Sequence, residues 1–263
     1  MTPLREADGA ARSDMTTVAP PLGRSDTTPT PGAPETLAVR SMFDRIAPRY
    51  DFINRLLSAG TDVRWRRRAV DALGLPPGAR VLDLCTGTAD LLIEALGRDG
   101  TRRGLGLDLS TAMLARASAK LERAHLTTRA GLVAGDAQRL PVGAGVLDGA
   151  LVAFGIRNVG DPAAALGELR RVLRPGGRLV VLEFSTPRGL FGVLFGAYSR
   201  LVLPRVGGWI SGDRGAYAYL PASVARFASP AAFGALMEAA GFTSVRWQPL
   251  TGGIAHIFEG TRR

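Results

Sequence analysis

A turn whose residues could bind a positively charged ligand follows a short apolar segment of the chain. Asp83 lies within that segment, and the sequence then reads Cys-Thr-Gly-Thr, which includes Gly87 and Thr88. A tight turn at the carboxyl end of a strand brings backbone and small side chains close to a ligand in open α/β sheets. The G-x-G-x-x-G spacing of a pyrophosphate-binding turn is absent here. The acidic residue therefore favours a ligand with ammonium and sulfonium groups, and a plain strand–turn–helix junction is the alternative.

Two further acidic positions follow the next two apolar segments. Asp108 ends the first of them, where a carboxylate can accept hydrogen bonds from both ribose hydroxyls of a nucleoside. The same residue could instead cap the helix that is expected to begin near Ser110. Asp136 and Ala137 follow the second segment, where a carboxylate or a backbone amide could contact an adenine edge, or form only a polar loop. Together with Gly87, these positions predict a nucleoside-binding crevice.

The elements that must position these residues form a regular pattern. From residue 80 onward, short apolar runs alternate with helical stretches, which is typical of a parallel α/β sheet. Five strands, an interruption, a helix and a final hairpin are the order expected of the Rossmann-like, seven-stranded, mostly parallel sheet of class I S-adenosylmethionine-dependent methyltransferases. The run Arg-Pro-Gly-Gly at 174–177 is expected to stop a helix. The predicted strands are 81–84, 104–108, 131–134, 147–154, 178–184, 244–250 and 254–259, and the predicted helices are 90–97, 110–123, 162–173 and 230–240.

The rest of the chain divides into three parts. Residues 1–36 are rich in Thr, Pro, Gly and Ala and have almost no large apolar side chains, so we expect a disordered N-terminal leader. Residues 37–75 have helical spacing and many arginines, which predicts two or three N-terminal helices. A single domain over 37–263 is expected, with residues 187–228 inserted after the fifth strand as a lid.

The composition excludes several kinds of site. Cys85 is the single cysteine and the two histidines are His125 and His256, so we expect neither a disulfide framework nor a metal centre. The 33 basic residues exceed the 23 acidic ones, and such a surface could attract nucleic acid, anionic lipid or an anionic small molecule. No apolar stretch is long enough to span a bilayer, and the N-terminus has no apolar signal core, so a cytoplasmic location is expected.

Several segments together are similar to one known family. The chain resembles the ubiquinone/menaquinone biosynthesis C-methyltransferases over about residues 39–260, and the match is not confined to the generic cofactor fold. The block around Tyr50, the Phe-Gly-Ile-Arg-Asn block from Phe154 and the Tyr-Leu-Pro block ending at Pro221 are specific in combination. The matching segments are the turn itself and residues 39–47, 50–54, 60–62, 65–66, 154–159, 173–178, 182–185, 210–213 and 217–221.

The resemblance implies S-adenosylmethionine as the cofactor, without a metal. One family contact precedes Phe154, where relatives often have serine and this chain has Ala153. A hydroxyl contact is therefore lost there, although a backbone contact could remain. The residues expected to contact the cofactor are Asp83, Gly87, Thr88, Asp108, Asp136, Ala137 and Ala153.

The resemblance also implies methyl transfer from sulfonium to a ring carbon of a hydroquinone, which is nucleophilic when the ring is reduced and a phenol loses its proton. Such a reaction needs in-line positioning and a group that stabilises phenolate. Arg157 is expected to stabilise the phenolate electrostatically, since arginine is a poor base, and Asn158 to orient an oxygen. The alternative is that both only pin their loop. Four further residues could close over the acceptor or serve only in packing: Tyr50, Asp51, Asp213 and Tyr217.

The implied substrate is a lipid-soluble polyprenyl quinol. We expect conversion of demethylmenaquinol to menaquinol in menaquinone biosynthesis, and methylation of a benzoquinol in ubiquinone biosynthesis is the alternative. Because such a quinol lies in the bilayer, the enzyme must reach it from the inner membrane face. The insertion 187–228 combines apolar residues with arginines, which suits either a lid over an apolar tunnel or an anchor on anionic lipid.

Two rival functions are disfavoured. A nicotinamide-dependent oxidoreductase would need the phosphate-binding glycines that the turn lacks. A nucleic-acid methyltransferase would need a base-flipping or RNA-binding motif, and the arginines are instead spread along the chain, so no nucleic-acid partner is expected. A homo-oligomer is left open.

Overall fold

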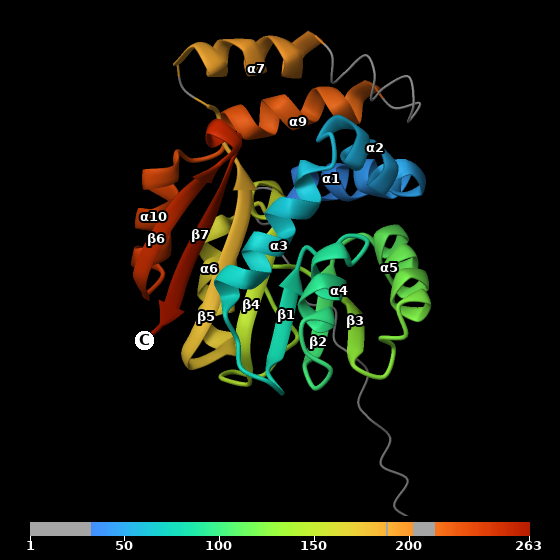
Figure 1. The fold of residues 1–263 in the computed structure, drawn as a ribbon, viewed down its shortest axis with the longest axis vertical. Helices are drawn as coiled ribbons and strands as arrows, with labels where there is room; N and C mark the ends of the chain where they lie inside the picture. Colours follow the sequence, from blue (N-terminus) through green and yellow to red (C-terminus); the bar gives the residue numbers. More distant parts are fainter. Residues whose placement is uncertain (1–32, 188, 202–213) are drawn as a thin grey trace, which may run out of the picture. The chain divides into compact units, whose positions relative to one another are not determined.

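The computed structural model describes residues 33–187, 189–201 and 214–263, which fold around a seven-stranded sheet (Figure 1). The strand order is β3-β2-β1-β4-β5-β7-β6, and β7 runs antiparallel to both of its neighbours. The strands are β1 (Arg80–Leu84), β2 (Arg103–Asp108), β3 (Ala130–Ala134), β4 (Leu147–Ala153), β5 (Leu173–Phe184), β6 (Phe242–Leu250) and β7 (Ala255–Arg262). The helices are α1 (Ala33–Ile46), α2 (Tyr50–Leu57), α3 (Thr61–Leu73), α4 (Asp90–Gly97), α5 (Thr111–Arg123), α6 (Pro162–Val172), α7 (Gly189–Leu201), α9 (Arg214–Arg226) and α10 (Pro230–Ala239), with short 3-10 turns η1 (Ala47–Arg49), η2 (Ile156–Asn158) and η3 (Thr251–Gly253).

The sheet confirms the predicted α/β fold, because all seven predicted strands and the four helices predicted with them are present. In the parallel registers Leu82 of β1 pairs with Leu105 of β2 and with Ala150 of β4, so β1 lies between these two strands. The carboxyl ends of neighbouring parallel strands meet at one edge, where open α/β sheets bind their ligands. The residues that follow Leu84, Leu107 and Val152 therefore share that edge.

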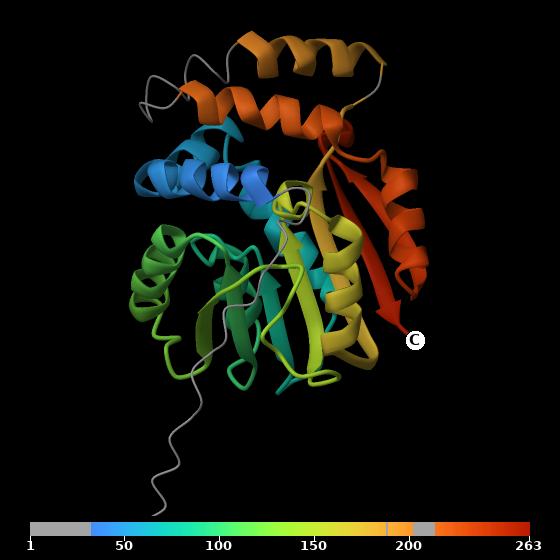
Figure 2. The ribbon, with the colours of Figure 1, turned by 180° about the vertical axis from the view of Figure 1, so that it is seen from behind.

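Helices cover both faces of the sheet, which explains why the central strands are apolar on both sides. On one face, Val81 and Val180 pack with Trp65 and Leu73 of α3. On the other face, Leu82 and its neighbours pack against α6 and α10. Figures 1 and 2, which view the chain from opposite sides, show α3 and α4 on the first face and α6 on the second.

Helices α1, α2 and α9 lie across the edge at which the parallel strands end (Figures 1 and 2). Met42, Ile46 and Ile53 form an apolar cluster with Met113 of α5, and Tyr219 of α9 packs against it. This cluster holds the N-terminal helices above the strand ends. Tyr50, the first residue of α2, packs against the same cluster.

Several predicted boundaries are shifted by one to three residues, and two differ by more than that. Helix α1 begins at Ala33, so the last four residues of the predicted leader belong to this helix, and residues 1–32 lie outside the described ranges. Helix α6 ends at Val172, one residue earlier than predicted, and the Pro-Gly-Gly run is not a turn before β5. Leu173 already pairs with Leu147, and a bulge shifts the register before Arg178 pairs with Gly149. Gly176 has a φ of +76°, which glycine adopts without strain and which lets the strand bend at this irregularity.

Candidate active site

A cavity of about 760 Å³, its open mouth included, lies at the carboxyl ends of β1, β2 and β4. Its lining combines apolar side chains with a few polar groups, as is typical of small-molecule sites. The strand ends contribute one wall, and α1, α2 and the segment 154–160 contribute the other. The lining residues are Val39, Arg40, Phe43, Tyr50, Cys85, Gly87, Leu107, Asp108, Leu109, Ser110, Met113, Gly135, Asp136, Ala137, Gln138, Ala153, Phe154, Gly155, Asn158, Val159 and Gly160.

Asp108 is held in the strand-end wall by backbone donors. The amide of Gly87 donates to its Oδ2 atom at 2.8 Å, and the amide of Ser110 donates to its Oδ1 atom at 2.9 Å. Burial raises the pKa of the Asp108 carboxyl, and the backbone donors partly offset this. Gly87 has a φ of +55°, so a side chain at this position would strain the turn that presents its amide. The arrangement fixes the carboxylate in place while it still lines the cavity.

Asp83 lies one strand away, beneath the turn. Its Oδ2 atom accepts hydrogen bonds from the hydroxyl of Thr86 at 2.6 Å and from the amide of Leu92 at 3.0 Å. Burial raises the pKa of this carboxyl to about 7. Asp83 is fully enclosed and is not among the residues that line the cavity. The structure therefore shows it supporting the turn from below, and direct contact with a ligand stays a prediction.

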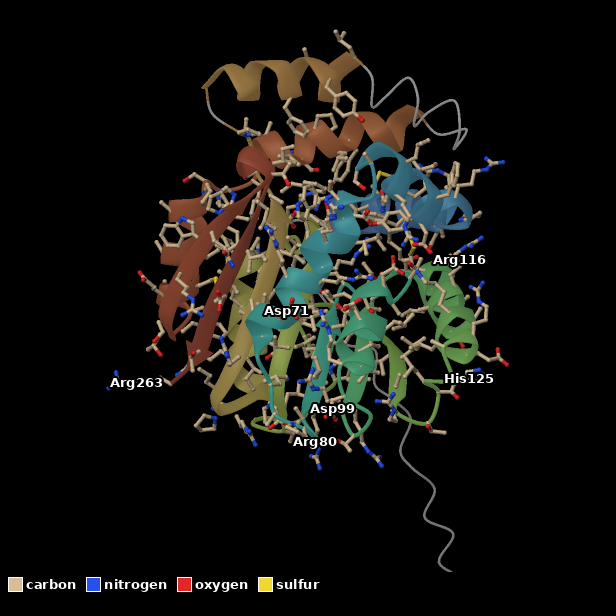
Figure 3. The ribbon with its side chains drawn as sticks, in the orientation of Figure 1. Asp71, Arg80, Asp99, Arg116, His125 and Arg263 are labelled. Carbon is tan, nitrogen blue, oxygen red and sulfur yellow. The ribbon has the colours of Figure 1, made fainter. Side chains whose placement is uncertain are left out.

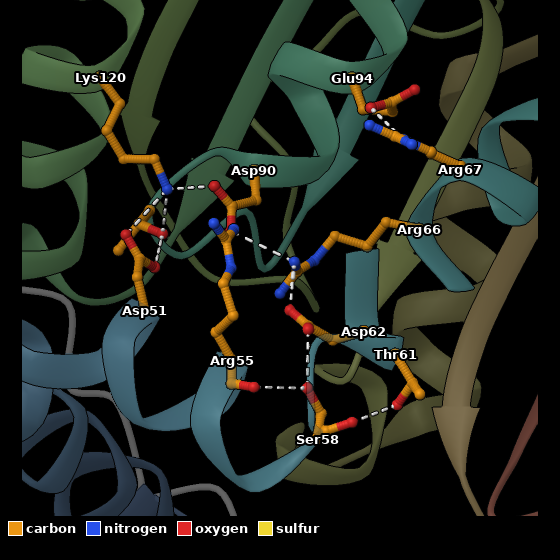
Figure 4. A network of polar contacts seen from close by, with 11 residues as sticks. Asp51, Arg55, Ser58, Thr61, Asp62, Arg66, Arg67, Asp90, Glu94 and Lys120 are labelled. Atoms are coloured by element: carbon orange, nitrogen blue, oxygen red, sulfur yellow. Dashed lines mark hydrogen bonds and ion pairs between the residues drawn. The ribbon is translucent and has the colours of Figure 1, made fainter. Parts of the chain in front are cut away.

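Thr88 is also absent from the cavity lining, and its hydroxyl instead bonds to Asp51 and Lys120, which belong to the network of polar side chains in Figure 4. Its hydroxyl donates to Asp51 Oδ1 at 2.5 Å and accepts from Lys120 Nζ at 3.1 Å. Burial would raise the pKa of Asp51, but the bonds from Thr88 and Lys120 outweigh it and lower that pKa below its ordinary value. Thr88 and Asp51, which were predicted to contact different ligands, are thus directly bonded to each other.

The remaining predicted cofactor residues complete the strand-end wall. Asp136 and Ala137 line the cavity after β3, and the Asp136 carboxylate is exposed and accepts from the amide of Gln138 at 2.9 Å. Ala153 lines the cavity at the end of β4. Its methyl group offers no hydrogen-bonding side chain, so any polar contact at this position is made by the backbone.

Tyr50 and Asn158 form the opposite wall. Burial raises the pKa of the Tyr50 phenol, and the nearby positive charge of Arg157 partly offsets this. Asn158 accepts a hydrogen bond from the Tyr219 hydroxyl at 3.1 Å through Oδ1. Its amide nitrogen donates to the carbonyl of Phe154 at 3.4 Å. The wall thus presents a phenol and an amide whose orientations are fixed by neighbouring elements.

Arg157 points away from the cavity that Asn158 lines. Its Nη1 atom donates to Glu183 Oε1 at 2.6 Å and to the Phe154 carbonyl. Its guanidinium is also 5.3 Å from the ring centre of Phe184. The side chain is 6% exposed and that of Glu183 is 0% exposed. This geometry matches the loop-pinning alternative, and the predicted contact with the acceptor phenolate stays a prediction.

Two predicted acceptor residues belong to the insertion. Asp213 lies outside the described residues. Tyr217 lies in α9, but its side chain is likewise outside what the structure describes. The described part of α9 instead contributes Tyr219, which the sequence pattern did not single out although it belongs to the Tyr-Ala-Tyr-Leu-Pro block.

Sequence reasoning missed several other residues of the site. Phe43 lines the cavity, and Asp44 accepts a hydrogen bond from Ser110 at the start of α5. Both belong to the first family-like block, which was the available signal. Lys120 is the single lysine of the sequence, and no spacing places it next to Asp51, which is 69 positions away. Within the described ranges, no helix is both long and apolar enough to cross a membrane.

The sequence matches the model of the ubiE/COQ5 methyltransferase family over residues 32–262. This chain belongs to that family. It is 51% identical over 222 residues to a demethylmenaquinone methyltransferase of Thermus thermophilus, a match that covers 84% of this chain and 100% of the relative. It is 48% identical to a ubiquinone/menaquinone biosynthesis C-methyltransferase of Syntrophotalea carbinolica, over 85% of this chain and 93% of the relative. The family predicted from the sequence blocks is therefore confirmed.

Solved structures of more distant proteins share the fold. The [4+2]-cyclase SpnF superposes with a TM-score of 0.65 at 17% identity, over 85% of this chain and 94% of that protein. A SAM-dependent methyltransferase from Aquifex aeolicus superposes with a TM-score of 0.56 at 18% identity, over 75% and 89%. A cyclase and a methyltransferase thus share one architecture, so these likenesses support the fold only, and the reaction must be argued from the family and the cavity.

Proposed function

We propose that this methyltransferase transfers a methyl group from S-adenosylmethionine to a ring carbon of demethylmenaquinol, which yields menaquinol. The observation that carries the proposal is one cavity with two chemically different walls. A buried carboxylate at the end of β2 faces it on one side, and Tyr50 and Asn158 face it on the other. The printed names of the relatives that match over most of this chain support the same reaction.

The strand-end wall fits the nucleoside part of S-adenosylmethionine. Asp108 lines the cavity with its carboxylate fixed by the amides of Gly87 and Ser110, which suits it to accept hydrogen bonds from ribose hydroxyls. Asp136 and Ala137 supply a carboxylate and a backbone amide where the adenine edge would lie. When bound, the cofactor supplies an electrophilic methyl group on its sulfonium. The residues of this wall bind and orient it.

The second wall fits a reduced aromatic acceptor. Asn158 is oriented by Tyr219 and by the Phe154 carbonyl, so its amide is positioned to hold one oxygen of the acceptor ring. The Tyr50 phenol keeps its proton, because burial raises its pKa, and it can donate that hydrogen bond to a phenolate. Arg157 contributes through the loop that it pins and through its positive charge near Tyr50. Such charge favours phenolate over phenol on the acceptor.

We further propose that the enzyme works at an anionic membrane surface on the cytoplasmic side, because a polyprenyl quinol is confined to the bilayer. Phe52 and Leu56, one turn apart on α2, are 63% and 49% exposed. The exposed arginines Arg64 and Arg68 follow on α3. Apolar side chains beside cations are the features with which peripheral helices bind anionic lipid. Replacement of Phe52 and Leu56 by serine should weaken sedimentation with phosphatidylglycerol vesicles, and unchanged binding in low salt would contradict this surface.

The decisive experiment supplies the purified protein with methyl-labelled S-adenosylmethionine and one of two acceptors in detergent. Demethylmenaquinone reduced in place is the first, and a reduced demethylated benzoquinone with the same prenyl chain is the second. We expect label in the naphthoquinol product and at least tenfold less in the benzoquinol product. Preference for the benzoquinol would assign the enzyme to ubiquinone biosynthesis instead. Absence of label from both products would overturn the proposal. A non-reduced sample is the control, since an oxidised ring has no nucleophilic carbon.

A further inference from the structure

Lys120 connects three elements that surround the site. Its ammonium donates to Asp51 Oδ2 at 2.9 Å, to Thr88 Oγ1 at 3.1 Å and to Asp90, which begins α4 (Figure 4). We call these four residues the Lys120 clasp. It joins α5 to α2, to the turn after β1 and to α4, and none of its residues is among those that line the cavity. The clasp was not among the features that the sequence predicted.

A lysine is the side chain that suits this position. Its ammonium carries three donors on a compact charge, and here it meets three acceptors on three elements. The planar fork of arginine cannot converge on the same three points without moving the helices. Every other basic side chain of this chain outside the two histidines is an arginine. The single lysine thus occupies a position at which an arginine could not bond to all three acceptors.

The clasp controls where α2 sits relative to the turn after β1. Asp51 accepts from Lys120 with one oxygen and from Thr88 with the other, and its neighbour Tyr50 lines the cavity. Asp90, the remaining member of the clasp, also pairs with Arg66 of α3 at 3.3 Å.

The far end of α2 is held by the same chain of contacts. Arg66 pairs with Asp62 at 2.7 Å, and Asp62 accepts from the Ser58 hydroxyl at 2.7 Å, just beyond the end of α2 (Figure 4). Both ends of this two-turn helix are therefore tied to the N-terminus of α4 through Asp90. A loss of Lys120 removes one of the two bonds that hold Asp51, at the end that carries Tyr50, and leaves the far end tied.

We infer that Lys120 is a positioning residue: by clasping Asp51 to Thr88 and Asp90, it sets the place of the acceptor wall relative to the cofactor wall. This inference rests on the proposed function, because it assigns Tyr50 to the acceptor. Misplacement of reacting groups by about 1 Å costs on the order of 10²-fold in rate. Lys120→Met should therefore lower kcat by about 30- to 100-fold. The affinity for S-adenosylmethionine should change by less than about threefold, since Asp108 and its backbone donors are untouched.

Four variants test this. Lys120→Met, Asp51→Asn, their double mutant and Lys120→Arg are assayed for kcat, for the KM of each substrate and for melting temperature. The double mutant should be no slower than Lys120→Met, because both changes break the same link. Lys120→Arg should recover part of the lost kcat by restoring the charge without the geometry. Arg116→Met, an exposed change one turn earlier on α5, is the matched control and should leave kcat unchanged.

Amide hydrogen exchange of residues 50–57 with S-adenosylmethionine present gives a readout that needs no acceptor. We expect faster exchange there in Lys120→Met, with exchange in α6 unchanged. If the native protein methylates no quinol, the proposed function fails, and this exchange result still decides whether the clasp holds α2. A folded Lys120→Met protein with native kcat, or one with a lower melting temperature alone, overturns the inference. If Lys120→Met does not fold, Asp51→Asn and Lys120→Arg decide by the same criteria.

Discussion

The two walls of the cavity are built in different ways. The strand-end wall relies on backbone amides close in sequence to the strand ends, as where Gly87 and Ser110 hold Asp108. The acceptor wall relies on side chains that meet across long stretches of sequence, as where Tyr219 holds Asn158 over 61 positions. Sheet topology thus determines the first wall, whereas contacts between separate elements determine the second. A substitution in the strand-end wall should therefore affect only the contacts of that residue. A substitution in the acceptor wall should also affect the neighbouring elements that the residue contacts.

Removal of Arg157 should have the largest effect on stability, and the effect should extend to the loop that carries Asn158. Arg157→Ala leaves Glu183 buried with no counter-charge, so we expect the free energy of unfolding to fall by about 3–5 kcal/mol in denaturant titrations. The Phe154 carbonyl also loses a donor, so the loop that carries Asn158 should loosen and kcat should fall with it. Arg157→Met combined with Glu183→Gln removes both charges and should regain most of the stability. A loss below about 1 kcal/mol in Arg157→Ala would show that the ion pair does not hold this wall together.

Among substitutions in the strand-end wall, Asp108→Ala should lower the affinity for S-adenosylmethionine most, and its effect should be confined to that wall. Two hydrogen bonds to a carboxylate contribute about 1.5–3 kcal/mol each, so S-adenosylmethionine should bind on the order of 10²- to 10⁴-fold more weakly in calorimetry. Asp108→Asn keeps the size and one acceptor and should lose less affinity. Native affinity in Asp108→Ala would contradict the ribose role. Measurable binding of NAD(P) by the native protein would point to the oxidoreductase alternative.

The same contrast explains what the sequence could predict. Asp108 was found because the end of a parallel strand is also the place where a ligand binds, so local pattern and function coincide. Asp83 has the same residue type at a similar position, yet it lies beneath the turn and bonds to Thr86 and Leu92. Which side of a turn a carboxylate faces depends on packing that no spacing encodes.

The acceptor wall was only partly predictable for the same reason. Arg157 and Asn158 were predicted as a pair from the family-like block, but the structure turns them in opposite directions. Asn158 lines the cavity and Arg157 meets Glu183, which is 26 positions away on β5. The fold, by contrast, depends on the periodicity of apolar residues, which is visible in the chain itself. The start of β5 at Leu173 was missed because the Pro-Gly-Gly run reads as a turn.

The pH dependence of stability should separate the buried Asp83 from the partly exposed Asp99. The folded-state pKa of Asp83 is raised from 3.8 to about 7, so the folded state holds a proton that the unfolded state loses. The contribution of Asp83 to the free energy of unfolding should therefore be fully present below about pH 4. It should fall as the pH rises toward 7, by up to about 1.4 kcal/mol per pH unit. Asp83→Asn should flatten this part of the profile in thermal melts.

Asp99 is the matched control for that measurement. It lies at the end of the sheet opposite the cavity, near Arg80 (Figure 3). Hydrogen bonds from Thr101 lower its pKa below the ordinary value, so its contribution has the opposite sign and is lost as the pH falls. Asp99→Asn should leave the slope between pH 5 and pH 7 unchanged. A native profile in Asp83→Asn would show that another group titrates in this window.

Asp136→Ala should have the smallest effect of these substitutions, and the quantity that it changes is the affinity for S-adenosylmethionine. The Asp136 carboxylate is exposed and already accepts from Gln138, so water can replace much of what it offers a ligand. One such hydrogen bond contributes about 0.5–1.5 kcal/mol, which predicts a two- to tenfold weaker affinity for S-adenosylmethionine with kcat unchanged. Asp108 and Asp136 follow neighbouring strands and differ chiefly in burial and in the amides that fix them. If both alanine variants lost the same affinity, the preorganised backbone donors of Asp108 would not be what distinguishes it, and binding would follow from carboxylate position alone.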